Sequence, residues 1–146
     1  MSLRVLLAVD GSVHALRAAE HVLRLREAGC ALEVFLLNVQ MPLQTGHVRI
    51  FLARESLDEH YRDEGLAALH EASALLERAG QKFATHIAVG NAAETIVHYA
   101  SEKAIELVVI GTHGRTGLRS VVMGSVAREV LSLSPVPVTV VRGAMR

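Results

Sequence analysis

Short, nearly continuous apolar runs alternate along the chain with longer stretches in which apolar residues recur at a helical spacing. The apolar runs have the length of β-strands and predict strands at Leu3 to Val9, Ala31 to Val39, Lys82 to Val89, Ile105 to Ile110 and Val136 to Val141. Strands of this composition are typical of a parallel sheet that is covered on both faces. The alternation predicts an α/β fold, with an open parallel five-stranded sheet and helices on both faces.

The helical stretches carry start and stop signals. Ser12 is a predicted N-cap because its hydroxyl can accept a free backbone N–H, and Asn91 is predicted to cap a later helix in the same way. The longest helical pattern extends from Ile50 to Ala79 and contains Gly65 as a candidate break into two helices. Between strand and helix, Gln40 to Val48 predicts an irregular loop at the carboxyl end of the second strand.

Composition agrees with one compact domain spanning residues 1–146. A chain of this length buries roughly two-thirds of its unfolded surface, which is enough for a core without metals or disulfides. No apolar run approaches the roughly 18 residues of a membrane helix, and the N-terminus lacks a signal-peptide pattern, so we expect a cytoplasmic protein without a membrane segment. Cys30 is the single cysteine, and we expect its thiol to be buried. Zero formal net charge and the absence of Trp give no reason to expect nucleic-acid binding.

A glycine-rich block near the C-terminus is the strongest chemical signal. Gly111, His113 and Gly114 follow an apolar strand, and Gly124 and Ser125 precede an amphipathic helix. Such loops bind phosphate because backbone amides point outward and the helix N-terminus carries partial positive charge. The alternative is that the glycines only make a flexible connection.

A second signal lies at the end of the first strand, where Asp10 and Gly11 precede the predicted cap. Asp-Gly is a frequent turn dipeptide, so Asp10 could serve only the turn. In open α/β sheets, however, ligands bind beyond the carboxyl ends of the strands, and Asp10 and Gly111 both lie at such ends. The two signals together predict a site for a nucleotide or another phosphorylated ligand.

Other sites fit the sequence less well. Gly124-Ser125 lacks the lysine of a Walker loop, the first strand is not followed by the glycine spacing of a dinucleotide fold, and no Asp ends the third strand as in a receiver domain. Among the eight histidines, His14 and His21 share a helix face but lie too far apart for one ion. We therefore predict no metal ligands in the protein itself.

These motifs resemble those of the universal stress protein family, in particular its ATP-binding branch. The resemblance rests on Val-Asp-Gly-Ser at residues 9–12, on the glycine block, and on Pro-Val-Pro-Val-Thr-Val-Val at 135–141, and it covers essentially the whole chain. It implies a Rossmann-like fold of the adenine-nucleotide alpha-hydrolase type, with strand order 3-2-1-4-5. It also implies contacts to adenosine by Asp10 and by the backbone of Val39. The implied ribose and phosphate contacts are Gly111, His113, Gly114, Gly124, Ser125 and Val126.

The implied function is a regulatory or stress-response module that binds ATP, ADP or AMP with Mg²⁺ or Mn²⁺ and acts on an unknown protein partner. The alternative is a dimeric interaction protein of the same fold that binds no nucleotide. Arg115 and Arg119 could contact phosphates or lie on the solvated side of the loop. No acidic residue falls between Gly111 and Arg128, so we expect no catalytic residue and at most slow ATP hydrolysis. The resemblance places Val136 to Val141 at a sheet edge, where a homodimer is expected to form.

Overall fold

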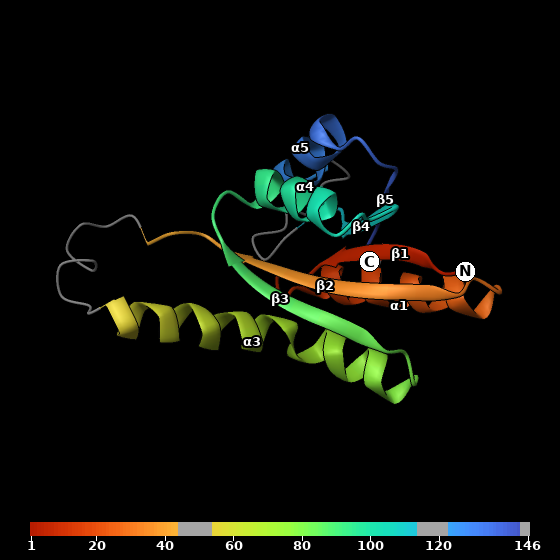
Figure 1. Cartoon of the computed structure of the whole chain (residues 1–146), viewed down its shortest axis with the longest axis horizontal. Coiled ribbons are helices and arrows are strands. Elements are labelled where there is room, and N and C mark those ends of the chain that lie inside the picture. Colours follow the sequence, from red (N-terminus) through yellow and green to blue (C-terminus); the bar gives the residue numbers. More distant parts are fainter. Residues whose placement is uncertain (44–53, 114–122, 144–146) are drawn as a thin grey trace.

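The computed structural model describes residues 1–43, 54–113 and 123–143, which form one parallel sheet between two layers of helices (Figure 1). In chain order the elements are β1 (Leu3–Ala8), α1 (Val13–Glu27), β2 (Leu32–Gln40), α3 (Arg54–Arg78), β3 (Phe83–Val89), α4 (Ala92–Glu102), β4 (Leu107–Gly111), α5 (Ser125–Leu133) and β5 (Val138–Val141). The strand order is β3-β2-β1-β4-β5 and every pairing is parallel. The predicted fold class and strand order are confirmed.

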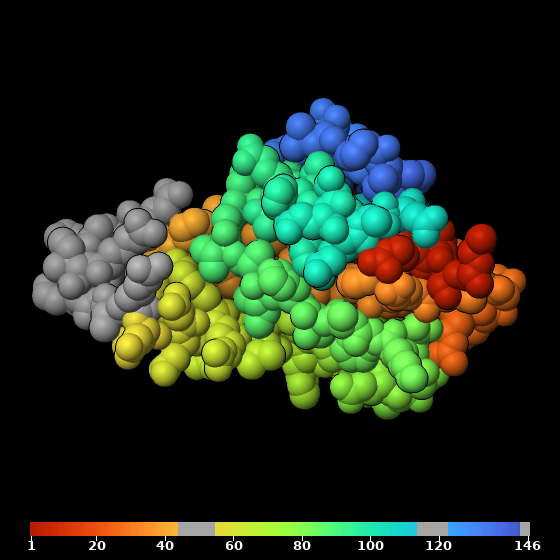
Figure 2. All heavy atoms as spheres, in the orientation of Figure 1, coloured from red at the N-terminus to blue at the C-terminus, as the bar shows by residue number. Residues whose placement is uncertain are grey.

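The central strand β1 is buried on both faces, which explains its continuous apolar run. Val5 and Leu7 join the core under α1 and α3, whereas Leu6 between them joins the core under α4 and α5. Successive side chains of a strand point to opposite faces, so each core takes alternate residues. With all atoms drawn, α3 covers the lower side of the molecule and α4 with α5 the upper side (Figure 2).

The order of the strands creates a crevice between β1 and β4. The chain leaves β1 into α1 on one face of the sheet and leaves β4 toward α5 on the other face. Connections that diverge in this way open the sheet at its carboxyl edge, where α/β proteins bind ligands. The fold thus places the segments after β1 and β4 side by side.

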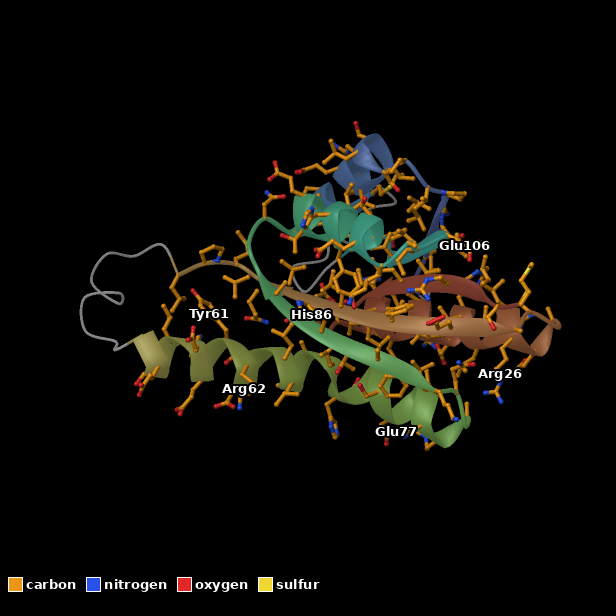
Figure 3. All side chains as sticks on the ribbon, in the orientation of Figure 1. Arg26, Tyr61, Arg62, Glu77, His86 and Glu106 are labelled. Carbon is orange, nitrogen blue, oxygen red and sulfur yellow. The ribbon has the colours of Figure 1, made fainter. Side chains whose placement is uncertain are left out.

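Polar side chains cap the N-termini of two helices, as the sequence predicts. The Ser12 hydroxyl accepts the Ala15 N–H at 3.2 Å, and the Asn91 amide oxygen accepts the Glu94 N–H at 3.0 Å. Both bonds satisfy amides that have no partner within their own helix. At the other end of the sheet, the Arg26 guanidinium donates to the Ala79 carbonyl at 2.6 Å and so joins α1 to the end of α3 (Figure 3).

The candidate break at Gly65 is wrong, because α3 is continuous through this residue. A Cβ at Gly65 would lie 2.6 to 2.8 Å from side-chain carbons of Ile87 on β3. Glycine is accommodated here because it lets the helix approach the sheet closely, and one glycine costs a helix only about 1 kcal/mol. The residue serves packing and does not end the helix.

Three further expectations from the sequence differ from the structure or fall partly outside the described residues. β5 begins at Val138, two residues later than predicted, after the second of two prolines, which have no N–H for a sheet. Cys30 is exposed, contrary to expectation, because it lies in the turn after α1 and outside the core. The predicted loop begins later than Gln40, which still belongs to β2, and its residues 44–48 lie outside the described ranges.

The chain that leaves β2 is attached to α3. The Leu43 N–H donates to the hydroxyl of Tyr61 at 2.9 Å, and Tyr61 extends from α3 toward this segment (Figure 3).

Among the described helices, none combines the length and the apolar character that crossing a membrane requires.

Candidate functional site

A cleft of about 620 Å³ lies at the carboxyl ends of β1, β2 and β4, beside the start of α5. Its size falls within the range of small-molecule sites, about 300 to 1,000 Å³. The cleft is lined by Ala8, Val9, Asp10, Ala15, Leu37, Val39, Ala92, Ile96, Ile110, Gly111, Thr112, His113, Met123, Gly124, Ser125, Val126, Ala127 and Arg128. It is the crevice that the reversal of strand order predicts.

One part of the cleft is apolar. Leu37 and Val39 enter it from β2, Ala8 from β1, and Ala92 and Ile96 from α4. No charged side chain belongs to this group of lining residues, so it suits an apolar or aromatic ring of a ligand. Backbone groups at the end of β2 can supply polar contacts at its edge.

Asp10 lines the cleft from the segment that follows β1, and it also stabilises the turn between β1 and α1. One carboxylate oxygen, Oδ1, accepts the Ser12 N–H at 3.0 Å, and Gly11 between them has φ +86°. A Cβ at Gly11 would lie 3.2 Å from the Ala68 Cα on α3, so glycine is required here for both conformation and space. A carboxylate has two oxygens that each accept more than one bond, so Asp10 can hold the turn and still accept a ligand hydroxyl.

A buried amide ties the ends of β1 and β2 together. Asn38 is 2% exposed, its Nδ2 donates to the Val9 carbonyl at 2.8 Å, and its Oδ1 accepts from Gln40 Nε2 at 2.7 Å. The first bond joins the segment that precedes Asp10 to β2 beside Val39, and the second fixes the orientation of the Asn38 amide. Asn38 was not among the predicted site residues, although a polar residue inside an apolar strand run is a signal for a buried, hydrogen-bonded side chain.

The start of α5 is rich in backbone donors. Gly124 is its N-cap residue and has no side chain to cap the helix, unlike the caps of α1 and α4. The amides of Ser125 and Val126 fall in the first turn, where no intrahelical acceptor exists. The helix dipole adds partial positive charge at the same place. This part of the cleft therefore suits an anion such as phosphate.

Arg128, which was not among the predicted site residues, adds a full positive charge to the cleft. Its side chain is exposed, lines the cleft from the first turn of α5, and donates from a guanidinium nitrogen to the Met123 carbonyl at 3.2 Å. Arg128 could have been predicted from its position three residues after Ser125, because this spacing places both residues on one side of the helix. Thr112 also lines the cleft and was not predicted.

The structure brings most of the predicted site residues together. Those that line the cleft are Asp10, Val39, Gly111, His113, Gly124, Ser125 and Val126. Gly114 and Arg115 lie outside the described residues. Segments at the two ends of the chain therefore contribute to one cavity, as the two sequence motifs predict.

Comparison with known proteins gives a consistent result. The sequence model of the universal stress protein family matches residues 1–142. Universal stress protein YxiE of Bacillus subtilis is 32% identical over 149 aligned positions, which span 95% of this chain and 98% of that protein. The solved structure of protein MJ0577 of Methanocaldococcus jannaschii has a TM-score of 0.82 at 30% identity, covering 99% of this chain and 98% of that one. The universal stress protein of Archaeoglobus fulgidus, solved in complex with dAMP, has a TM-score of 0.59 at 26% identity and covers 97% and 98% of the two chains.

Proposed function

This chain belongs to the universal stress protein family, and we propose that it is an adenine-nucleotide-binding regulatory module of the stress response. ATP is the proposed ligand, with ADP and AMP as further candidates. We further propose that residues 1–146 act as one domain in the cytoplasm. The observation that carries the proposal is the division of one cleft into an apolar part and a part rich in backbone donors.

The proposed pose follows the chemistry of the lining. The adenine ring occupies the apolar part and forms a hydrogen bond with the backbone of Val39. The Asp10 carboxylate accepts a hydrogen bond from a ribose hydroxyl. The phosphates lie at the start of α5, where Ser125 and Val126 offer amides and Arg128 offers a charge. The complex of the Archaeoglobus fulgidus relative with dAMP supports the choice of an adenine nucleotide.

The remaining proposed contacts are three glycines, one histidine and one more arginine. Gly111, Gly114 and Gly124 are proposed to contact the ribose and phosphates through their backbones, His113 contacts the nucleotide, and Arg115 joins the phosphate group. Within the described residues, no group of three or more His, Cys, Asp or Glu side chains could hold a metal. The proposed Mg²⁺ or Mn²⁺ would therefore be held through phosphate oxygens and water, as these ions prefer.

The direct test combines mass spectrometry of nucleotide carried through purification with calorimetric titration of ATP, ADP and AMP. Replacing Ser125 with alanine is expected to weaken binding by about 1 to 2 kcal/mol, because one hydroxyl–phosphate bond is lost while the backbone amide remains. Ser132→Ala on the same helix is the matched control, since Ser132 is exposed and does not line the cleft. Equal loss in both variants would mean that Ser125 makes no specific contact.

The alternative function is a dimeric interaction protein that binds no nucleotide. It requires that the donors at the start of α5 have no ligand, although their helix lacks a side-chain cap. Purified protein that carries no nucleotide and gives no heat with ATP, ADP or AMP would favour this alternative.

Hydrolysis of ATP is expected to be slow. Fast phosphoryl transfer needs a positioned water, metal ligands and usually a base, and no acidic residue falls between Gly111 and Arg128. A typical enzyme turns over about 10 times per second, and we expect roughly a thousandfold less. The assay uses excess Mg-ATP with Gly124→Val as the control for contaminating ATPase. Turnover above about 1 per second that is lost in this variant would identify an enzyme.

We also propose a homodimer through the edge strand β5, within the predicted range Val136 to Val141. The carbonyls of Pro137 and Val141 face β4, where they accept from Val108 and Thr112. Because backbone groups alternate along a strand, the N–H groups of Val138 and Val140 face away from the sheet and can pair with a second chain.

Removing one outward donor is expected to weaken this dimer. Val140→Pro deletes the N–H at an edge position that tolerates proline, whereas Thr139→Pro deletes an N–H that faces β4 and is expected to destabilise the monomer. Lysine at Val138 or Val140 would disturb the monomer as well as the dimer, since both side chains pack against the core under α4 and α5. Light scattering across a concentration series should show a dimer that Val140→Pro dissociates. A wild type that stays monomeric at high micromolar concentration would refute the proposal.

A further inference from the structure

Two histidines from distant parts of the chain lie next to each other, and one of them, His113, lines the cleft. His14 belongs to the first turn of α1, and His113 is the second residue after the end of β4. Their ring centroids are 5.4 Å apart and the ring planes are tilted by 54°. His14 has no metal partner at helical spacing in the sequence, so only the fold creates this pair.

Each ring has a buried nitrogen without a partner. In the described part of the chain, the buried side-chain nitrogen and oxygen atoms that lack a hydrogen bond are Nδ1 of His14 and Nε2 of His113. Buried polar atoms normally find a partner, and an exception requires an explanation such as a bound ion or water. Both exceptions fall on two adjacent rings, which points to one common ligand.

The packing around His14 fixes its position. A Cβ at Gly111 would lie 2.9 Å from the carbonyl carbon and Cβ of His14, so α1 approaches β4 at a distance that only glycine permits. A Cβ at Gly143 would collide with Nδ1 of His14, so only a residue without a side chain fits beside this nitrogen. The pair is therefore held between two close backbone approaches.

The separation of the rings suits a shared metal ion. Two imidazoles that bind one tetrahedral ion through bonds of about 2.0 to 2.1 Å have centroids roughly 5 Å apart, close to the observed spacing. Neutral imidazole prefers zinc, cobalt, nickel and copper, whereas Mg²⁺ prefers oxygen ligands. Sulfate or phosphate is a poorer fit, since a neutral imidazole contributes at most one donor.

We propose that His14 and His113 together bind one divalent transition-metal ion of the zinc, cobalt and nickel class. No third His, Cys, Asp or Glu completes the site within the described residues, and the sequence 114–122 contains none of these types. Water or a phosphate oxygen fills the remaining positions, as in metal sites that keep open positions for a ligand. This ion is distinct from the Mg²⁺ or Mn²⁺ proposed to accompany a nucleotide, and its binding does not require a nucleotide.

The test titrates tag-free, chelator-treated protein with Co²⁺ and Zn²⁺ alone, using the visible absorption of bound Co²⁺ and calorimetry. We expect one Co²⁺ per chain, displaced by Zn²⁺ and not by excess Mg²⁺. His14→Phe and His113→Phe keep the ring packing but remove the nitrogens, and each is expected to weaken binding at least tenfold. His70→Ala is the matched control, because His70 is exposed on α3 and belongs to neither the pair nor the cleft.

Thermal unfolding provides a second measurement that does not depend on the variants keeping full stability. Zn²⁺ is expected to raise the midpoint of the wild type and of His70→Ala, and to leave both phenylalanine variants unchanged. The proposal is overturned if the wild type binds neither metal at submillimolar concentration, or if the phenylalanine variants bind as tightly as the control. Because no nucleotide is present, failure here leaves the proposed nucleotide function standing.

Discussion

Replacing Gly124 with valine is expected to weaken adenine-nucleotide binding at least 100-fold, a loss of about 2.7 kcal/mol. Gly124 lines the cleft at the N-cap of α5, and its N–H donates to the Thr112 carbonyl at 2.7 Å. A Cβ at this position would lie 2.8 Å from that carbonyl oxygen and 3.3 Å from the His113 Cα. The valine therefore separates the end of β4 from the start of α5, which together form the proposed phosphate site.

The measurement is calorimetric titration of ATP, with thermal unfolding recorded in the absence of ligand. Crowding at a packed position costs about 1 to 3 kcal/mol of stability, so a control with a similar loss is needed. Val22→Ala serves this purpose, because Val22 is fully buried on α1 and does not line the cleft. Gly124→Val that binds ATP within threefold of the wild type would contradict the proposed site.

Replacing Gly111 with valine is expected to lower the free energy of unfolding by about 3 kcal/mol. The new Cβ would meet the carbonyl carbon, the carbonyl oxygen and the Cβ of His14, each at 2.9 Å. These are mainly backbone atoms of α1, so relief requires the whole helix to move away from β4. Domains are stable by about 5 to 15 kcal/mol, and this substitution removes a large part of that margin.

Urea unfolding of the wild type and of Gly111→Val measures this loss. Ala28→Val is the matched control, because Ala28 is exposed at the end of α1 and a surface substitution typically changes stability by less than 0.5 kcal/mol. Gly111→Val should also lower the thermal midpoint by roughly 10 °C in a chain of this length. A loss below about 1 kcal/mol would show that α1 accommodates a side chain here, against the close contact described.

Glycines show how far sequence patterns extend. Gly111 and Gly124 were identified from their place between a strand and a helix, and both line the cleft. Gly65 was a candidate helix break, yet it lies inside α3 against Ile87 of β3. A glycine signals a requirement for space or conformation, but the partner that imposes the requirement is not local in the sequence.

Features that depend on near neighbours in the chain could be predicted from the sequence alone. Apolar runs predicted the strands, the spacing of apolar residues predicted the helices, and Ser12 and Asn91 predicted helix starts, because a cap bonds to an amide only three residues away. The order of the strands came from resemblance to the family, since strand periodicity does not say which strands pair. Local rules also placed Asp10 and Gly111 at the carboxyl edge of a parallel sheet, where ligands bind.

Which distant residues meet depends on the folded arrangement of the elements. The amide of Asn38 reaches the carbonyl of Val9 on the neighbouring strand, and the ring of His14 lies against that of His113, although no spacing in the sequence relates either pair. Cys30 is exposed for the same reason: burial depends on where the turn after α1 falls relative to the packed layers and not on the residue type. Hydrophobic pattern specifies which face of an element is buried, whereas the pairing of side chains across the core depends on strand order, register and the close approach of helices.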